Sequence, residues 1–344
     1  MRKIGVAVIG LGFAGSNLHL VSYLENKNCK IKAICDVNRN YSKKFPPTLF
    51  GEFTTDYREI LGRVDVDAVS IATPPKFHYL ITLDALKAGK HVLCEKPFVM
   101  TLSQAKDIMV AEKKYGKHVM VGLTFRYLKP FFEFKKILSD NKNPLISIRC
   151  TEFELLLKNH KWDKWEDWQF NPAMSPGAAL SESGTHLIDR MRWLLGSEVR
   201  KVYATTSGYE NNHKKDHSAF VILHFANGVI GEISLSYQVF SQYQNDKALC
   251  LTEIFGNDFY ACVNYQDYFK SNPSITLYDN YQWKNLKLDV DPKNPAQHEI
   301  DAFIQSIIQN KKPPITSYDG YKNLEVLLAA YKSSKTGKPV TLNE

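Results

Sequence analysis

The stretch Lys3-Ile-Gly-Val-Ala-Val-Ile-Gly-Leu-Gly-Phe-Ala-Gly15 joins a β-branched run to a glycine-rich turn. Its last six residues have the spacing G-x-G-x-x-G, and a helical pattern follows at once. In that setting Gly10 permits a tight turn, Gly12 lets the backbone approach a pyrophosphate, and Gly15 lets the helix pack closely on the strand. The amides and the positive dipole end of the helix N-terminus favour phosphate groups. This stretch predicts the first strand and helix of a dinucleotide-binding fold.

The first third of the chain continues to alternate short apolar runs with helical patterns. Predicted strands lie at 3–9, 30–35, 66–72, 91–94 and 118–122, and predicted helices at 14–26, 38–46, 76–89 and 101–115. Such alternation is typical of a parallel sheet built from βαβ units. We therefore expect residues 1–124 to form a Rossmann domain of the α/β class, with a doubly wound parallel sheet.

After about residue 124 the pattern changes to longer strands with few intervening helices. Predicted strands lie at 145–157, 200–209, 217–226, 229–238, 248–256 and 258–265, and predicted helices at 130–139, 183–195, 297–309 and 318–335. Consecutive alternating strands indicate an antiparallel sheet. We expect residues 125–344 to form an α+β domain with an open, largely antiparallel sheet, which binds substrate and mediates oligomerisation.

Composition narrows the class of protein. The 344 residues exceed what one hydrophobic core usually organises, which fits two domains. The net charge is +8, but the basic residues form scattered doublets, which argues against a nucleic-acid partner. Charged residues interrupt every candidate for the roughly 18 apolar residues of a membrane span. The six cysteines form no metal or redox motif. We expect a cytoplasmic protein without a metal or a membrane partner.

Asp36 follows the second predicted strand, 21 residues beyond Gly15. An acidic side chain at this place accepts hydrogen bonds from the adenosine ribose hydroxyls. It also repels a 2′-phosphate, so NAD is favoured as cofactor, while the nearby Arg39 leaves NADP as an alternative. A turn aspartate without a ligand is the competing interpretation.

Two further strand ends carry polar residues, Thr73-Pro74 after one strand and Glu95-Lys96-Pro97 after the next. Ligands of such sheets bind beyond the carboxyl ends of the strands. Lys96 is therefore well placed to hold a substrate hydroxyl by a charge-assisted hydrogen bond. An ordinary surface lysine before a turn proline is the alternative.

These motifs resemble the glucose-fructose oxidoreductase, inositol dehydrogenase and rhizopine-catabolism family, abbreviated Gfo/Idh/MocA. The resemblance extends over essentially the whole chain. It implies an NAD-dependent dehydrogenase acting on a sugar or cyclitol, and association through a sheet face into a homodimer or homotetramer. Its residues are the loop 10–15, Thr73-Pro74 with His78, Glu95-Lys96-Pro97, the stretch 177–189, Pro313, Asp319-Gly320 and the stretch 330–337.

The resemblance also implies roles for single residues. Lys96 contacts the reacting hydroxyl, the Lys96-Pro97 peptide is cis, and His186 acts as acid and base with Glu182 as its acidic partner. Positions i and i+4 share one face of an α-helix, so Glu182 could orient His186. The family more often has Asp at position 182, so the longer Glu is a departure. Without the resemblance, a core histidine and a surface carboxylate explain the pair equally well. The residues expected to contact the cofactor are Gly10, Gly12, Phe13, Ala14, Gly15, Asp36, Arg39, Thr73, Pro74, His78, Glu95 and Lys96.

Three more residues are expected to shape the substrate pocket together with Lys96, Glu182 and His186. Arg126 and Tyr127 follow the Rossmann half directly. Trp168 is the last of three tryptophans spaced by three residues, a pattern typical of a core or an interface as well as of sugar stacking. Residues 155–175 are interpreted as a lid or an interface.

The expected reaction is reversible hydride transfer between the nicotinamide and a secondary alcohol or ketone. Oxidation releases the hydroxyl proton, so a base is required, and His186 and Lys96 fit that need. Reduction of a ketone or imine, and a lyase or isomerase cycle that retains NAD, are alternatives on the same scaffold. A non-enzymatic, NAD-responsive regulator is the alternative of another class.

Overall fold

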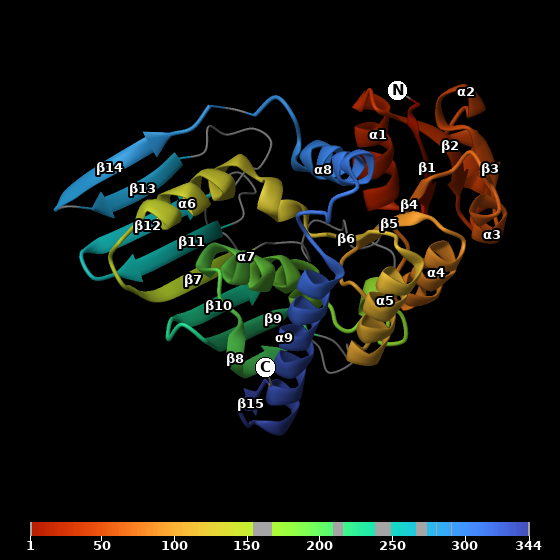
Figure 1. Ribbon diagram of the computed structural model, residues 1–344. Helices are drawn as coiled ribbons and strands as arrows, with labels where there is room; N and C mark the ends of the chain where they lie inside the picture. Colours follow the sequence, from red (N-terminus) through yellow and green to blue (C-terminus); the bar gives the residue numbers. More distant parts are fainter. Residues whose placement is uncertain are drawn as a thin grey trace. The chain divides into compact units, whose positions relative to one another are not determined.

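The computed structural model describes residues 2–153, 167–208, 216–237, 249–265, 274–279, 281–289 and 291–342 (Figure 1). The chain divides into two compact units. The first holds Met1–Thr124 with Lys293–Tyr321, and the second holds Phe125–Pro292 with Lys322–Glu344. The division expected from the sequence differs in one respect, because it assigned 293–321 to the second domain.

The first unit is built on a six-stranded parallel sheet with the order β3-β2-β1-β4-β5-β6. The strand order reverses beside β1, which makes the sheet doubly wound, as predicted, and places the ligand crevice at the carboxyl ends of β1 and β4. The strand β3 was not predicted, because three residues carry too little periodicity. The strands are β1 Ile4–Ile9, β2 Cys29–Cys35, β3 Glu52–Thr54, β4 Ala68–Ile71, β5 His91–Glu95 and β6 Val119–Gly122.

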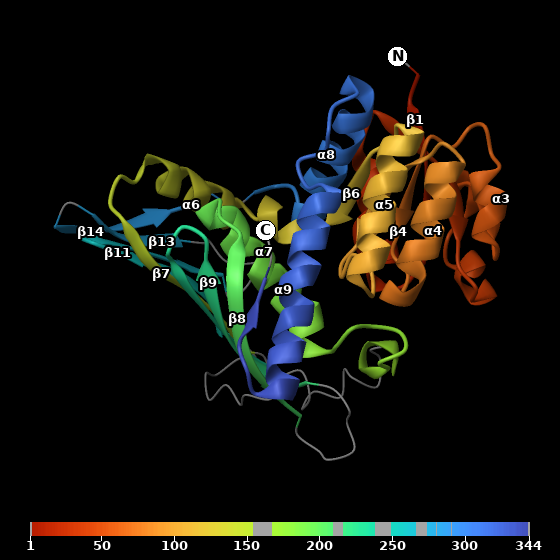
Figure 2. The same ribbon diagram turned by 60° about the horizontal axis from the view of Figure 1, so that its bottom comes forward.

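Helices cover both faces of this sheet. Helices α4 (Pro75–Lys87) and α5 (Leu102–Tyr115) pack side by side on one face (Figure 2). The π-helical segment η1 (Ala14–Leu20), α1 (Val21–Glu25) and α8 (Pro295–Gln309) pack together on the other. Helix α8 belongs to this unit because its apolar face is buried there, and its Asp301 accepts a hydrogen bond from Asn26 at 2.6 Å.

The helix predicted at 38–46 is wrong in extent. Only Arg39–Lys43 is helical, as the 3₁₀ turn η2. The prolines at 46 and 47 account for this, since the residue before a proline disfavours the α conformation. The short helices α2 (Pro47–Phe50) and α3 (Tyr57–Leu61) follow.

The second unit is built on a nine-stranded sheet with the order β14-β13-β12-β11-β7-β10-β9-β8-β15 in the described part of the chain. Only the β7–β10 pair is parallel, so the predicted, largely antiparallel sheet is confirmed. Strands β13 to β15 were not predicted. The strands are β7 Leu145–Phe153, β8 Val199–Ser207, β9 Ser218–Phe225, β10 Ile230–Ser236, β11 Leu249–Gly256, β12 Phe259–Asn264, β13 Ser274–Asp279, β14 Gln282–Lys287 and β15 Val340–Thr341.

Helices α6 (Lys129–Asp140) and α7 (Thr185–Leu195) lie on one face of the nine-stranded sheet (Figure 2). The unit also contains the 3₁₀ turn η5 (Asp167–Phe170), the π-helical segment η6 (Leu180–Gly184) and all but the first residue of the 3₁₀ turn η3 (Thr124–Tyr127). The long helix α9 (Ser317–Thr336) begins in the first unit and ends in the second. Within the described ranges no helix is long and apolar enough to span a bilayer.

Candidate active site

The glycine-rich turn after β1 has the close packing that its spacing predicts. Gly10 has φ +92°, and a Cβ atom there would lie 2.6 Å from the carbonyl carbon of Ala72. A Cβ atom at Gly15 would lie 1.9 Å from the carbonyl oxygen of Gly10. Both positions therefore exclude a side chain, and the helical run that starts at Ala14 approaches β1 and β4 closely.

Asp36 follows β2 and binds the glycine-rich turn directly. Its Oδ2 accepts a hydrogen bond from the Leu11 amide at 2.7 Å, and its Oδ1 accepts one from the Asn38 amide at 2.8 Å. A carboxylate has about four acceptor positions, so both oxygens keep capacity for ribose hydroxyls. Arg39 lies exposed in η2, three residues further on.

Thr73 and Pro74 lie where β4 ends, next to the glycine-rich turn. A Cβ atom at Gly10 would come within 2.8 Å of the Thr73 amide, so the two turns touch. The Thr73 hydroxyl is buried and has no hydrogen-bond partner among the described residues. An orphaned buried hydroxyl needs a partner. Together with the glycine cradle and the acceptor capacity of Asp36, it fits a dinucleotide at this edge.

The turn after β5 carries Lys96, and its peptide bond to Pro97 is cis, as expected. The buried Glu95 holds this turn, because its Oε2 accepts a hydrogen bond from the Lys96 amide at 3.0 Å. Its Oε1 lies 3.0 Å from Nε2 of His19, a buried residue of η1. Burial raises the pKa of Glu95, but the His19 contact and the charge of Lys96 outweigh it, so that the pKa is lowered. Glu95 thus contacts the protein and stays ionised while it binds the Lys96 amide.

His78, expected at the cofactor, is completely buried in α4. Its Nε2 lies 2.7 Å from the Thr73 carbonyl oxygen, and its Nδ1 lies 3.0 Å from that of Pro97 and 3.2 Å from that of Phe98. The ring therefore contacts the backbone of the two turns. Burial lowers its pKa despite these carbonyl groups.

Two buried residues of this edge were missed from the sequence, His19 and Glu299. Glu299 of α8 accepts a hydrogen bond from the Thr124 hydroxyl at 3.0 Å, and its Oε1 has no partner among the described residues. Burial and the charge of Glu95 raise its pKa well above the usual range. A signal for His19 existed, because it lies one helical turn beyond Gly15. Nothing local points to Glu299.

In the second unit, Glu182 and His186 lie where η6 passes into α7. Positions i and i+4 share one face of an α-helix, but residues 180–184 are π-helical, with i→i+5 hydrogen bonds. The spacing alone therefore does not determine how the two side chains meet. The His186 ring stacks on that of Phe125, with centroids 4.1 Å apart and an interplanar angle of 14°. Both Glu182 and His186 are half-buried.

A buried carboxylate that the sequence did not reveal supports this segment. Asp216 accepts hydrogen bonds from the amides of Ala178 and Leu180, at 2.9 and 2.6 Å, just before Glu182. The Tyr331 hydroxyl donates to the same carboxylate at 2.9 Å. A Cβ atom at Gly177 would lie 1.7 Å from that hydroxyl, which explains a glycine at this position.

The other predicted pocket residues, Arg126, Tyr127 and Trp168, differ in their contacts and burial. Arg126 of η3 donates two hydrogen bonds to Asp189 of α7, at 2.8 and 2.6 Å, so part of its guanidinium is engaged in a buried ion pair. Tyr127 is half-buried in the same turn, and Trp168 is half-buried in η5. Trp162, Trp165 and most of the segment 155–175 lie outside the described residues.

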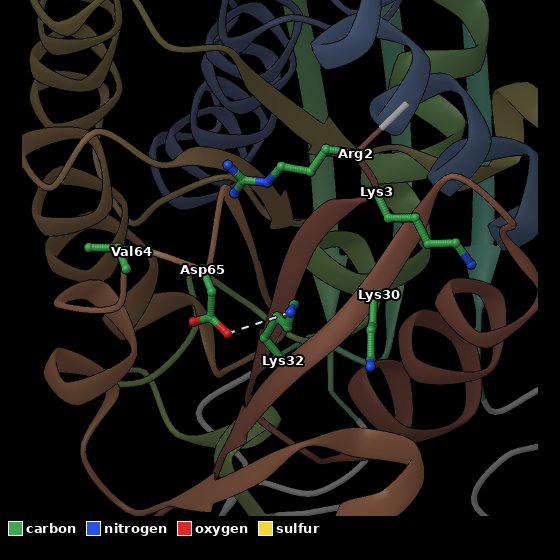
Figure 3. Close-up of a pocket in the computed structure, with 6 residues that line it drawn as sticks. All are labelled: Arg2, Lys3, Lys30, Lys32, Val64 and Asp65. Atoms are coloured by element: carbon green, nitrogen blue, oxygen red, sulfur yellow. Dashed lines mark ion pairs between the residues drawn. The ribbon is translucent and has the colours of Figure 1, made fainter.

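A surface hollow lies at the opposite edge of the first sheet. It is formed where β1 and β2 begin, and Lys32 pairs with Asp65 at 3.6 Å within it (Figure 3). Because the strands are parallel, this is the edge away from Thr73 and Lys96, so the hollow does not belong to the predicted crevice. Its lining residues are Arg2, Lys3, Lys30, Lys32, Val64 and Asp65.

Comparison with protein families accounts for both units. Residues 4–123 match the model described as "Oxidoreductase family, NAD-binding Rossmann fold". Residues 149–258 match the GFO/IDH/MocA C-terminal domain, and residues 266–342 match the C-terminal alpha/beta domain of the oxidoreductase family. The chain belongs to the Gfo/Idh/MocA family. It is therefore an NAD-binding oxidoreductase.

Several named oxidoreductases are similar to this chain over nearly their whole length. The inositol 2-dehydrogenase/D-chiro-inositol 3-dehydrogenase of Shouchella clausii is 28% identical, covering 97% of this chain and 93% of that protein. The D-glucoside 3-dehydrogenase of Escherichia coli is 25% identical, covering 98% and 97%. The aldose-aldose oxidoreductase of Caulobacter crescentus has the same fold, with a TM-score of 0.86 at 22% identity over 99% of this chain and 100% of the other.

Proposed function

We propose that this member of the Gfo/Idh/MocA family oxidises a secondary alcohol of a sugar, cyclitol or related polyol with NAD, reversibly. The observation that carries the proposal is the fixed Lys96 turn, held by Glu95 beside the Thr73 turn at the carboxyl edge of the sheet. The inositol and glucoside dehydrogenases among its relatives support this substrate class.

When bound, NAD would supply the hydride acceptor, and the glycine-rich turn, Asp36 and Thr73 would hold it. The protein must then remove the hydroxyl proton and stabilise the oxygen that becomes a carbonyl. Lys96 donates a hydrogen bond to that oxygen, and His186 takes the proton, directly or through Lys96. Glu182 orients His186. Each proton-transfer group contributes on the order of a hundredfold or more to the rate.

Further contacts are proposed for the cofactor and the substrate. Asp36 receives the adenosine ribose, and the orphaned Thr73 hydroxyl bonds to the cofactor. Arg126, Tyr127 and Trp168 line the substrate side. Arg126 is held by its ion pair with Asp189. Its first contribution is therefore to orient the turn η3.

The deciding experiment measures NAD(H) and NADP(H) binding by calorimetry, followed by a polyol panel read at 340 nm. We expect NAD(H) to bind more tightly than NADP(H), and Asp36→Ala to weaken NAD(H) binding by roughly tenfold or more, because a hydrogen bond to a charged group is lost. Lys96→Ala and His186→Ala should each abolish most turnover. Stoichiometric NADH release excludes a cycle that retains the cofactor. If wild-type protein binds neither cofactor, the proposal fails.

We also propose that the protein is cytoplasmic and forms an even-numbered homo-oligomer through the outer face of the nine-stranded sheet. All six cysteines lie outside disulfide bonds, and five are buried, consistent with a reducing compartment. Tyr203, Phe220, Ile222 and Ile230 expose apolar surface on neighbouring strands β8 to β10, which supports a sheet-face contact.

A further inference from the structure

The imidazole of His78 connects two turns that come from different strands. Its Nε2 lies 2.7 Å from the carbonyl oxygen of Thr73, which follows β4. Its Nδ1 lies 3.0 and 3.2 Å from the carbonyl oxygens of Pro97 and Phe98, which follow β5. All three distances are within the range of N–H···O hydrogen bonds. The ring is completely buried, so water does not compete for either nitrogen.

Both nitrogens therefore face groups that can only accept hydrogen bonds. A neutral imidazole carries one N–H, and its other nitrogen presents a lone pair. Burial lowers the pKa of His78, which favours the neutral ring, although the negative charge of Glu95 opposes this. One proton thus serves two turns. When it is on Nε2 it bonds the Thr73 turn, and when it is on Nδ1 it bonds the Lys96 turn.

We propose that His78 is a positioning residue that couples the cofactor turn at Thr73 to the substrate turn at Lys96 through a single imidazole proton. The identity of the two turns rests on the proposed function. A contact at Thr73 that changes the orientation of its carbonyl group shifts the preferred tautomer, and the bond to the Pro97-Phe98 backbone changes with it. Binding of NAD would in this way adjust the backbone that carries Lys96.

The hydrogen-bonding contact of each ring nitrogen can be removed separately by substitution. The amide nitrogen of asparagine occupies roughly the place of Nδ1, and that of glutamine roughly the place of Nε2. His78→Asn should keep kcat within about threefold and raise the KM for NAD about tenfold, since the loss of a buried hydrogen bond corresponds to a factor of that order. His78→Gln should show the reverse, with kcat lowered about tenfold and the KM for NAD kept within about threefold. His78→Phe should both lower kcat and raise the KM for NAD.

Melting temperatures separate positioning from stability. Ile81→Val, a buried change one turn along α4 without a hydrogen-bonding group, is the matched control and should leave both constants in place. Opposite kcat and KM effects of the Asn and Gln variants support the coupling. If kcat falls and KM rises together in all His78 variants, in proportion to the decrease in melting temperature, His78 is only structural and the inference is overturned.

Hydrogen exchange gives a readout that does not require turnover. NADH should slow amide exchange at residues 98–100 in wild-type protein and in Ile81→Val, but not in His78→Phe. If His78→Phe does not fold, the Gln variant takes its place, because it also lacks the Nδ1 contact. If NADH binds wild-type protein but does not slow amide exchange at residues 98–100, the coupling alone is overturned. Absence of NADH binding in wild type overturns the proposed function and the coupling together.

Discussion

Ionisable side chains at the carboxyl edge of the first sheet bind backbone groups of the turns that surround them. Asp36 accepts from the Leu11 amide, Glu95 from the Lys96 amide, and His78 lies against the Thr73 carbonyl group. Hydrogen bonds to ionised groups are stronger than neutral ones, so the Asp36 and Glu95 contacts hold their turns in place. At the scale of single residues, charge here positions the backbone as well as meeting a ligand.

Ionisation of the buried Glu299 should affect stability. Burial raises its pKa above the usual 4.5, so the folded state holds a proton that the unfolded state releases. Stability should therefore fall as pH rises above that value. Glu299→Gln cannot ionise, so its melting temperature should rise relative to wild type as pH increases from 5 to 9. A constant difference between the two proteins over that range would contradict the assignment.

Two π-helical segments, η1 and η6, occur where the sequence predicted function. The first follows the glycine-rich turn and carries His19, and the second contains Glu182. Such segments are frequent at functional sites, because an i→i+5 turn changes the direction of the side chains that follow. An α-helical periodicity cannot reveal them, and the expected Glu182–His186 register was affected for that reason.

The segment before η6 should be sensitive to a single methyl group. Gly177→Ala places a Cβ atom on the Tyr331 hydroxyl and so disturbs the Asp216 carboxylate that holds residues 178–180. We expect a loss of about 1–3 kcal/mol in unfolding free energy, as for overpacked cores, and reduced turnover. In the control Gly62→Ala the nearest atom would be 3.7 Å away, so its stability should change little. Equal denaturant midpoints for both variants would refute this role of Gly177.

At the scale of the whole molecule, the second sheet has one face packed by α6 and α7 and an outer face with exposed apolar side chains. Phe220 is 52% exposed on β9, and Tyr203 lies opposite Ile222 on the neighbouring strand pair. Exposed apolar patches of this kind mark interaction sites more often than isolated apolar residues do.

Phe220→Asp should therefore dissociate the proposed homo-oligomer. A charge in the centre of an apolar contact loses its hydration without gaining a partner. The expected result is a reduced mass by light scattering with an unchanged circular-dichroism spectrum. Val110→Asp, at an exposed position on α5 of the first unit, is the control and should leave the mass unchanged. A monomeric wild-type protein would rule out the sheet-face contact.

The sequence by itself determined the features that depend on neighbouring residues. The glycine spacing 10–15, Asp36 after β2 and the Glu95-Lys96-Pro97 turn are local patterns with local physical causes, so the doubly wound sheet and the NAD-binding class could be predicted. The alternating strands likewise predicted the largely antiparallel second sheet. Short strands such as β3 and β15 were not predicted, because two or three residues are too few to show an alternating pattern.

The tertiary structure decided what each polar side chain touches. His78 and Glu95, expected at the cofactor, contact the backbone of the turns, and Glu95 also contacts His19. Asp216 and Tyr331 meet across 115 positions of sequence, and α8 returns to the first unit after a long excursion of the chain. Such pairings depend on burial and on the close approach of distant segments, and no local pattern specifies them.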